Sequence, residues 1–149
     1  MCWEHSGAKP DILAVGKAIS GGTMPVSAAF ANDEIMSVIK PGDHGTTYGG
    51  NALGMTVAKA AISTLMEEGL VENSAKMGEI LLDKLSAIKS PLIKDVRGQG
   101  LFLAIEMKRD LYVNGNDLAE CLMMRGLTTK PTHTYTLRFS PTLAITEPQ

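Results

Sequence analysis

The sequence has few cysteines, no long apolar run and no excess of basic charge. Its two cysteines, Cys2 and Cys121, are too few for a disulfide scaffold and indicate a reducing compartment with buried or inert thiols. No apolar run reaches the roughly 18 residues of a membrane-spanning helix. The formal net charge of -2 leaves no basic surface for nucleic acid. We therefore expect small molecules or further copies of the chain as partners, with no nucleic acid and no membrane.

Histidine is also sparse, and His5, His44 and His133 share no metal-ligand spacing. No cluster of cysteines or carboxylates accompanies them, so we expect no metal site. The N-terminus lacks the basic and apolar regions of a signal peptide. What is present is the composition of a globular chain, since 44% of the 149 residues are hydrophobic and 20% are charged. This length fits one ordinary domain or two small ones.

One lysine stands out, because Lys17 lies between an apolar run and a glycine-rich turn in the segment LAVGKAISGG. An ammonium group surrounded by Leu13, Val15 and Ile19 would lose hydration, which favours the neutral, nucleophilic amine. Such an amine attacks a carbonyl carbon to give a Schiff base. A solvated surface charge is the alternative that the spacing alone leaves open.

The pattern of apolar residues predicts a mixed α/β architecture. Residues 12–15 and 26–31 are short apolar segments bounded by glycine or proline, which is typical of strands. We expect these strands to be buried on both faces, in a sheet covered by helices. Further strands are predicted at 93–96, 101–107 and 136–139, and helices at 33–38, at 51–68 with Asn51 as the N-cap, at 71–88 and at 117–125.

The two ends of the sequence carry expectations of their own. Residues 146–149 combine an N-cap threonine, a proline near the first turn and a glutamine at the third place, which resembles a capping box and predicts a helix that begins there. At the other end, the first predicted strand comes with no preceding unit to supply its neighbours. We therefore expect the chain to be an internal piece of a longer protein.

Three motifs in order carry a resemblance to a known family. They are PDILAVGKAISGG at 10–22 followed by PVSA, HGTTYGGN at 44–51, and VRGQGL at 96–101. These motifs resemble the cofactor-lysine segment, the glycine-rich loop and a later element of the class III pyridoxal-phosphate aminotransferases. Within that family, the tyrosine of the loop and the segments IKPGDH, KPTH and RFSP are similar to the ornithine aminotransferase branch. Ala52 after the loop and Thr142 after Ser-Pro depart from the usual pattern.

The resemblance implies the aspartate-aminotransferase fold, type I of the pyridoxal-phosphate enzymes. Residues 1–69 would be the last part of the large cofactor domain, and 70–149 most of the small α+β C-terminal domain. The intact enzyme would transfer the δ-amino group of L-ornithine to 2-oxoglutarate with pyridoxal 5′-phosphate as cofactor, as a homodimer or higher oligomer. The acetylornithine and 4-aminobutyrate branches, and a non-catalytic truncated form, stay open. The resemblance leaves both the cytoplasm and the mitochondrial matrix as compartments.

The resemblance also assigns roles to four residues. Lys17 would form the Schiff base and shuttle the proton. Thr46 and Thr47 would contact the phosphate, chiefly Thr47 across a dimer interface, although a helix-capping role also fits these residues. Arg138 would pair with a substrate carboxylate, with a purely structural arginine as the alternative. The family's aspartate for the pyridine nitrogen, its stacking aromatic residue and a further phosphate-binding loop precede the matched segment.

Overall fold

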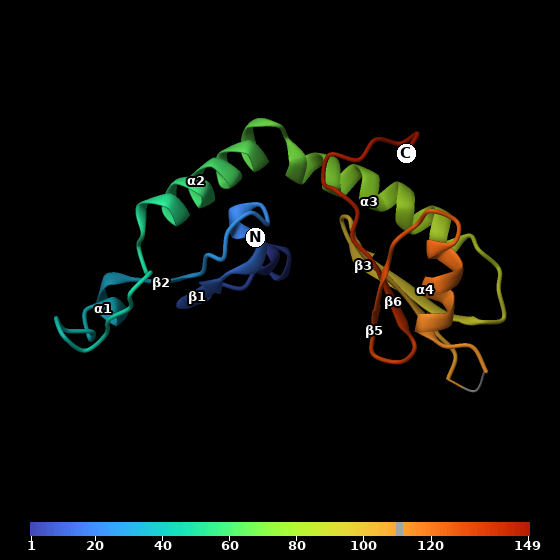
Figure 1. The fold of residues 1–149 in the computed structure, drawn as a ribbon, viewed down its shortest axis with the longest axis horizontal. Helices are drawn as coiled ribbons and strands as arrows, with labels where there is room; N and C mark the ends of the chain where they lie inside the picture. Colours follow the sequence, from blue (N-terminus) through green and yellow to red (C-terminus); the bar gives the residue numbers. More distant parts are fainter. Residues whose placement is uncertain (110–111) are drawn as a thin grey trace. The chain divides into compact units, whose positions relative to one another are not determined.

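The computed structural model describes residues 1–109 and 112–149. The chain divides into two compact units, Met1–Glu67 and Glu68–Gln149 (Figure 1). Within the described part of the chain, no helix is long and apolar enough to cross a membrane.

The first unit, coloured blue to green in Figure 1, combines a two-stranded sheet with short helical turns and one long helix. Strands β1 (Ile12–Val15) and β2 (Ala28–Ala31) are antiparallel, with Ile12 opposite Ala31 and Val15 opposite Ala28. The helical elements are the 3-10 turns η1 (Cys2–Ser6) and η2 (Lys17–Ser20), and the α-helices α1 (Asp33–Met36) and α2 (Ala52–Glu67). Strand β1 ends before Gly16, and its last residue, Val15, pairs with Ala28. Residues 26 and 27 therefore have no partner on β1, and β2 is shorter than the predicted 26–31.

The prediction that both strands are buried on both faces is wrong for this chain. Along β1, exposed and half-buried residues alternate, and Ile12 is 60% exposed. Phe30 on β2 is 54% exposed. The reason is that β1 and β2 pair only with each other within the described residues, so one face of each strand lacks a cover.

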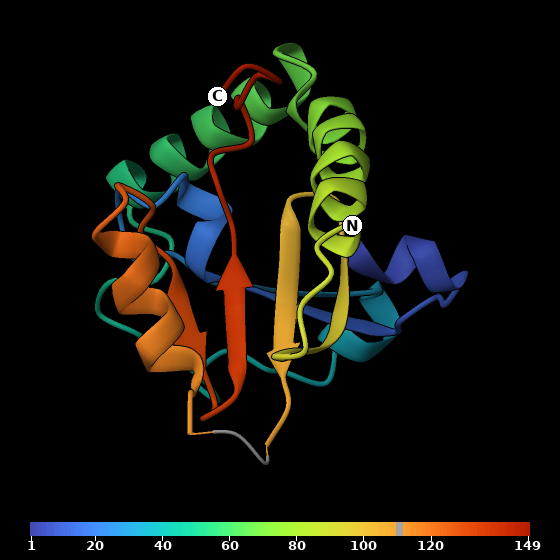
Figure 2. The same cartoon turned by 90° about the vertical axis from the view of Figure 1, so that its right-hand side faces the viewer.

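The second unit is a four-stranded antiparallel sheet with two helices. Its strands β3 (Ile93–Gln99), β4 (Phe102–Met107), β5 (Lys130–Thr132) and β6 (Thr136–Phe139) are arranged in the order β3-β4-β6-β5. Helices α3 (Leu70–Ser86) and α4 (Gly115–Met123) lie against this sheet (Figure 2). Strand β6 has the predicted bounds, and the β3–β4 hairpin lies where two strands were predicted around the VRGQGL motif.

Apolar residues at every second position build the core of this unit. Leu103 and Ile105 of β4 and Leu137 and Phe139 of β6 form one buried cluster. The leucines that pack against it come from α3 and from α4, namely Leu81, Leu82, Leu85, Leu118 and Leu122, so both helices cover the same face of the sheet. Fully burying a leucine side chain stabilises a fold by about 1.5–3 kcal/mol. Residues of alternate register, including Arg138, therefore lie on the opposite face.

The VRGQGL motif fixes the approach of helix α3 to the β3–β4 turn. A Cβ atom on Gly78 of α3 would lie 2.2 Å from the carbonyl carbon of Gly100, so the helix and the turn touch backbone to backbone. The backbone N–H of Leu101 donates to Ser74 Oγ at 3.1 Å across the same contact. Gly98 has φ 151°, and a Cβ there would lie 2.3 Å from the carbonyl oxygen of Phe102. The glycines of this motif thus serve packing.

Three local features differ from the sequence predictions. Helix α4 begins at Gly115 and not at Asp117, because Asn114 is the N-cap and Asp117 completes a capping box with it. Strand β5 was not predicted, since it contains Pro131, which is tolerated there because β5 is an edge strand. The thiols of Cys2 and Cys121 are exposed, not buried, because η1 buries no residue and Cys121 lies on the solvent side of α4.

Candidate functional site

Lys17 occupies the turn that follows strand β1. It is the first residue of η2 and has φ 54°, a left-handed conformation that a lysine adopts at a cost of about 1–2 kcal/mol. The turn is held by Ser20, which is 1% exposed and whose hydroxyl donates to the backbone oxygen of Met24. Thr23 Oγ1 donates to the backbone oxygen of Ser20 at 2.8 Å. Local hydrogen bonds therefore hold a strained lysine in place, as is common at functional sites.

The expected desolvation of Lys17 is not observed in this chain. Leu13, Val15 and Ile19 are half-buried, whereas Lys17 itself is exposed. The physical reason is the same as for Ile12. Strands β1 and β2 form a sheet of only two strands, which is too small to bury a residue at the end of β1. The amine is accessible to a ligand.

The loop of Thr46 and Thr47 leads directly into helix α2. Asn51 caps this helix as predicted, because its Oδ1 accepts from the backbone N–H of Gly54 at 2.7 Å and its Nδ2 donates to the backbone oxygen of Tyr48 at 2.7 Å. The loop is tight, since a Cβ on Gly49 would lie 2.1 Å from Thr46 Cγ2. With Asn51 as the cap, the threonine hydroxyls are not required for capping.

Arg138 lies in the middle of β6, on the sheet face that α3 and α4 leave open. It pairs in register with Ala104 of β4 on one side and with Lys130 of β5 on the other. Its guanidinium carbon lies 5.4 Å from the centre of the Phe102 ring. Its Nε is buried and, within residues 1–109 and 112–149, has no hydrogen-bond partner. A buried guanidinium nitrogen without a partner is suited to an anionic ligand, since leaving it unpaired is costly.

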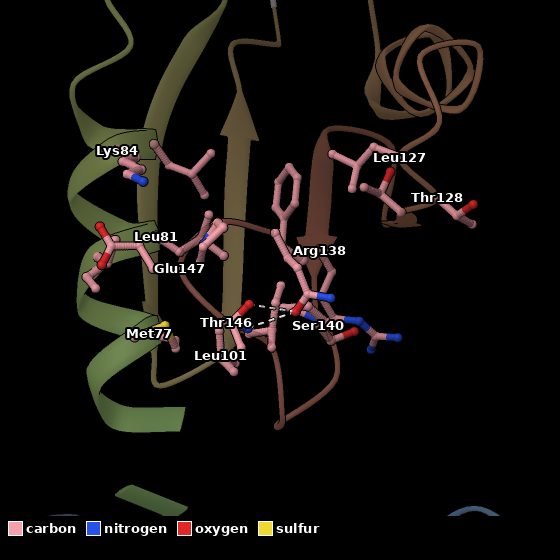
Figure 3. A pocket seen from close by; sticks show the side chains of 18 of the residues that line it. Met77, Leu81, Lys84, Leu101, Leu127, Thr128, Arg138, Ser140, Thr146 and Glu147 are labelled. Atoms are coloured by element: carbon pink, nitrogen blue, oxygen red, sulfur yellow. Dashed lines mark hydrogen bonds between the residues drawn. The ribbon is translucent and has the colours of Figure 1, made fainter. Parts of the chain in front are cut away.

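A cavity of about 720 Å³ lies between α3, the β5–β6 end of the sheet and the chain's last residues, and Arg138 is one of the residues that line it. Figure 3 shows Met77 and Leu81 of α3 on one side, Leu127 and Thr128 on the other, and Arg138 between them. The chain's last residues also line it, and there the capping box predicted at 146–149 forms in part, because the backbone N–H of Thr146 donates to Gln149 Oε1 at 3.0 Å.

Four charged residues form a network on β3 and β4. Glu106 accepts from Lys94 at 2.6 Å and from Arg97 at 2.8 Å, and Arg97 also donates to Asp95 at 2.7 Å. The hydrogen bonds from Lys94 and Arg97 lower the pKa of Glu106 below its usual value. The hydrogen bonds that Arg97 donates to Asp95 and Glu106 raise the pKa of Arg97. Arg97 is thereby engaged with carboxylates of its own sheet, in contrast to Arg138.

The predicted site residues fall in both units. Lys17, Thr46 and Thr47 belong to the first unit, and Arg138 belongs to the second. Phe102, which contacts Arg138 from the neighbouring strand, was not among the predicted site residues. The signal was readable, since Phe102 falls out of phase with the buried positions 103, 105 and 107 and so had to lie on the other face.

One known family model matches a segment that includes the lysine turn, the threonine loop and the VRGQGL hairpin. The model for class-III aminotransferases matches residues 1–149. The chain belongs to this family. Members of it are pyridoxal-phosphate enzymes, and no cluster of three or more potential metal ligands occurs among the described residues of this aminotransferase chain.

Curated relatives of this aminotransferase chain include ornithine aminotransferases. The chain is 46% identical over 151 residues to the ornithine aminotransferase of Plasmodium yoelii yoelii, an alignment that covers 100% of this chain and 36% of that protein. It is 47% identical over 149 residues to the mitochondrial ornithine aminotransferase of Drosophila melanogaster, covering 98% and 33%. The chain thus spans about a third of the length of these relatives.

Solved structures support the same fold. The ornithine aminotransferase of Plasmodium yoelii is similar with a TM-score of 0.94 and 46% identity, covering 100% of this chain and 40% of that one. The acetylornithine aminotransferase of Elizabethkingia anophelis is similar with a TM-score of 0.93 and 43% identity, also covering 100% and 40%. The aminotransferase chain therefore has part of the mixed α/β fold of the pyridoxal-phosphate-dependent aminotransferases, as predicted.

Proposed function

We propose that this chain is part of an enzyme that transfers the δ-amino group of L-ornithine to 2-oxoglutarate, giving glutamate semialdehyde and glutamate. The observation that carries the proposal is the 46% identity, along the whole chain, to a protein named ornithine aminotransferase. Residues 1–69 would form the end of the cofactor domain and 70–149 most of the small domain. We expect a homodimer or higher oligomer in the cytoplasm or the mitochondrial matrix, and the mitochondrial relative from Drosophila supports the matrix.

Lys17 is the residue proposed to bind pyridoxal 5′-phosphate covalently. Its exposed side chain fits this role because the amine is accessible, and hydrogen bonds hold the turn that follows it. The bound cofactor supplies an electron sink for the carbon that bears the reacting amine. Lys17 Nζ would remove the proton from that carbon and return it at the end of the transfer.

Thr46 and Thr47 are proposed to hold the phosphate, with Thr47 as the main contact across a dimer interface. Asn51 occupies the cap of α2, so the threonine hydroxyls are left for another partner. The helix N-terminus adds a favourable partial charge for an anion. These observations fit a phosphate in front of α2.

Arg138 is proposed to bind a substrate carboxylate. A guanidinium presents parallel N–H groups that match a carboxylate, which fixes the substrate in orientation as well as in place. The unpartnered Nε and the stacking on Phe102 support this role. A purely structural arginine would be expected to bond to carboxylates of the sheet, as Nη1 of Arg97 does with Asp95 and Glu106.

An acetylornithine aminotransferase is the second candidate function. The similarity to the Elizabethkingia anophelis structure, with a TM-score of 0.93, is consistent with it. The two candidates share the roles of Lys17, Thr47 and Arg138 and differ only in the amino donor. A non-catalytic truncated form is a third possibility, which an activity measurement separates from both.

A chimeric enzyme tests the proposal. Residues 1–149 replace the matching 36% of the Plasmodium yoelii ornithine aminotransferase, and transamination is measured with ornithine, acetylornithine and 4-aminobutyrate. We expect turnover of ornithine with 2-oxoglutarate, and none in the Lys17→Ala chimera. A matched control is Lys9→Ala, since Lys9 is exposed and lies before β1.

The outcomes of this test are distinct. A folded chimera that prefers acetylornithine would replace the main candidate by the second. Borohydride reduction followed by peptide mapping gives an independent measurement, because the pyridoxyl label is expected on Lys17. A label on another lysine would refute the assignment of Lys17.

A further inference from the structure

Asn51 makes two side-chain hydrogen bonds at the start of helix α2, and only one of them caps the helix. Its Oδ1 accepts from the backbone N–H of Gly54 at 2.7 Å, which is the capping bond. Its Nδ2 donates to the backbone oxygen of Tyr48 at 2.7 Å, and the backbone N–H of Asn51 donates to the same oxygen at 3.3 Å. Serine or aspartate would cap a helix about equally well. The bond from Nδ2 is therefore a second role, which needs an amide donor.

Burial does not fix the loop that this second bond holds. Residues 41–50 are exposed throughout, and the Tyr48 side chain is 81% exposed. The loop is nevertheless tight, because a Cβ on Gly49 would lie 2.1 Å from Thr46 Cγ2. Among the described residues, the hydrogen bonds of residues 44–50 are those that Asn51 donates to Tyr48. Asn51 is therefore the residue that ties this loop to α2.

The carboxamide of Asn51 packs closely against the first turn of α2. Gly54 is buried there, and a Cβ on it would lie 3.0 Å from Asn51 Nδ2 and 3.2 Å from Oδ1. Glycine at this position therefore leaves the space that the carboxamide occupies. Further along the helix, a Cβ on Gly21 of the lysine turn would lie 3.5 Å from Ala61 Cβ. The helix to which Asn51 ties the threonine loop thus also packs against the lysine turn.

We propose that Asn51 is a positioning residue for phosphate binding, which holds the loop in the conformation in which Thr47 contacts the anion. The inference rests on the proposed function, in which Thr47 contacts the phosphate of pyridoxal 5′-phosphate. Thr47 directly precedes Tyr48, so a fixed Tyr48 carbonyl restricts the backbone on which the threonine is carried. A loop that is ordered before the ligand arrives loses less conformational entropy on binding, and therefore binds more tightly. The role is indirect, because Thr47 makes the contact.

The test replaces Asn51 by serine, which keeps an oxygen for the cap and removes the amide donor. The matched control is Asn32→Ser. Asn32 caps helix α1 through the same kind of bond, since its Oδ1 accepts from the backbone N–H of Ile35 at 2.9 Å. Within residues 1–109 and 112–149, however, its Nδ2 donates to no partner. Both variants are made in the chimeric enzyme, and thermal unfolding checks that each remains folded.

Two ligands separate phosphate binding from the rest of the site. The cofactor-free chimera is titrated with pyridoxal 5′-phosphate and with pyridoxal, which lacks the phosphate. We expect Asn51→Ser to weaken binding of pyridoxal 5′-phosphate about five-fold and to leave pyridoxal within about two-fold, because only the phosphate meets the loop. Asn32→Ser should leave both affinities within about two-fold. In a Thr47→Ala background, Asn51→Ser should weaken binding by less than about two-fold more, because it acts through the hydroxyl that is already removed.

An equal loss of affinity for both ligands in Asn51→Ser would overturn the proposal, because a general defect of the fold affects both alike. Unchanged binding of pyridoxal 5′-phosphate would also overturn it, as would an undiminished effect in the Thr47→Ala background. If Asn51→Ser does not fold, Asn51→Asp takes its place, since it too keeps the capping oxygen and lacks the donor, and retained affinity there would count against the proposal. These titrations measure no turnover, so they decide the role of Asn51 even if the chimera fails to use ornithine.

Discussion

Replacing Gly78 by alanine gives a sharp test of the packing of α3, because two physical effects predict opposite signs. Gly78 lies in the middle of a 17-residue helix. Helix propensity alone predicts that alanine stabilises such a position by about 1 kcal/mol. The structure predicts destabilisation, because the new Cβ would lie 2.2 Å from the Gly100 carbonyl carbon and 2.3 Å from its oxygen.

The size of the effect follows from what must move. Carbon atoms in contact are normally about 3.5–4.0 Å apart, so the helix and the turn must separate by more than about 1 Å. Overpacking of this kind typically costs about 1–3 kcal/mol. The displacement also strains the bond from the Leu101 N–H to Ser74 Oγ, which contributes about 1 kcal/mol. After the gain in propensity, we expect a net loss of about 2 kcal/mol in the free energy of unfolding of the second unit.

Two measurements check this expectation. Thermal unfolding followed by circular dichroism should show the second unit melting about 10 °C lower. Hydrogen exchange should show a lower opening free energy at the amides of Leu103 and Ile105, which belong to the core. The control is Glu79→Ala, an exposed neighbour on the same helix, which should change stability by less than about 0.5 kcal/mol. Unchanged or raised stability in Gly78→Ala would refute the backbone contact.

Three further predictions concern the chemistry and the charges. Thr47→Ala in the chimera should weaken cofactor affinity by about 1–2 kcal/mol, measured by equilibrium dialysis, and unchanged affinity would favour a loop without phosphate contact. The 149-residue chain alone should show no transamination, because the family's aspartate for the pyridine nitrogen lies outside the matched segment and the edges of β1 and β2 favour aggregation; turnover that Lys17→Ala abolishes would contradict this. Finally, Glu106 has a lowered pKa, so its ion pairs stabilise the fold above the ordinary glutamate pKa of about 4.3 and lose that contribution as the pH falls further. Glu106→Gln should therefore flatten the loss of stability in urea unfolding between about pH 4.5 and 3, and an unchanged pH profile would contradict the lowered pKa.

Local sequence signals predicted the elements that depend on local interactions. Asn51 caps α2, and the alternation of Thr136 to Phe139 gave strand β6 its bounds, because capping and side-chain period act within a few residues. Strand β5 was missed because a proline within a three-residue strand carries no strand signal, and only the pairing with β6 makes it one. Because β5 was not predicted, the position of Lys130 opposite Arg138 was not predicted either, since it depends on the register between β5 and β6.

Burial was the least predictable property, because it depends on which elements surround a strand. The apolar segments at 12–15 and 26–31 were correctly placed as strands, but their exposure follows from a sheet of only two strands. The exposure of Lys17 has the same origin. Its backbone conformation could not have been predicted either, since lysine as a residue type does not favour a left-handed backbone.

At position 17, the residue that is best for stability differs from the residue that the proposed chemistry requires, because the backbone is left-handed there. Glycine adopts φ 54° without the steric cost that lysine bears there, so it is the residue that the fold itself would prefer. Any selection or engineering programme that rewards thermal tolerance alone should accumulate glycine at position 17 and discard the amine in the process. A variant stabilised in this way would keep the fold and lose the amine of Lys17.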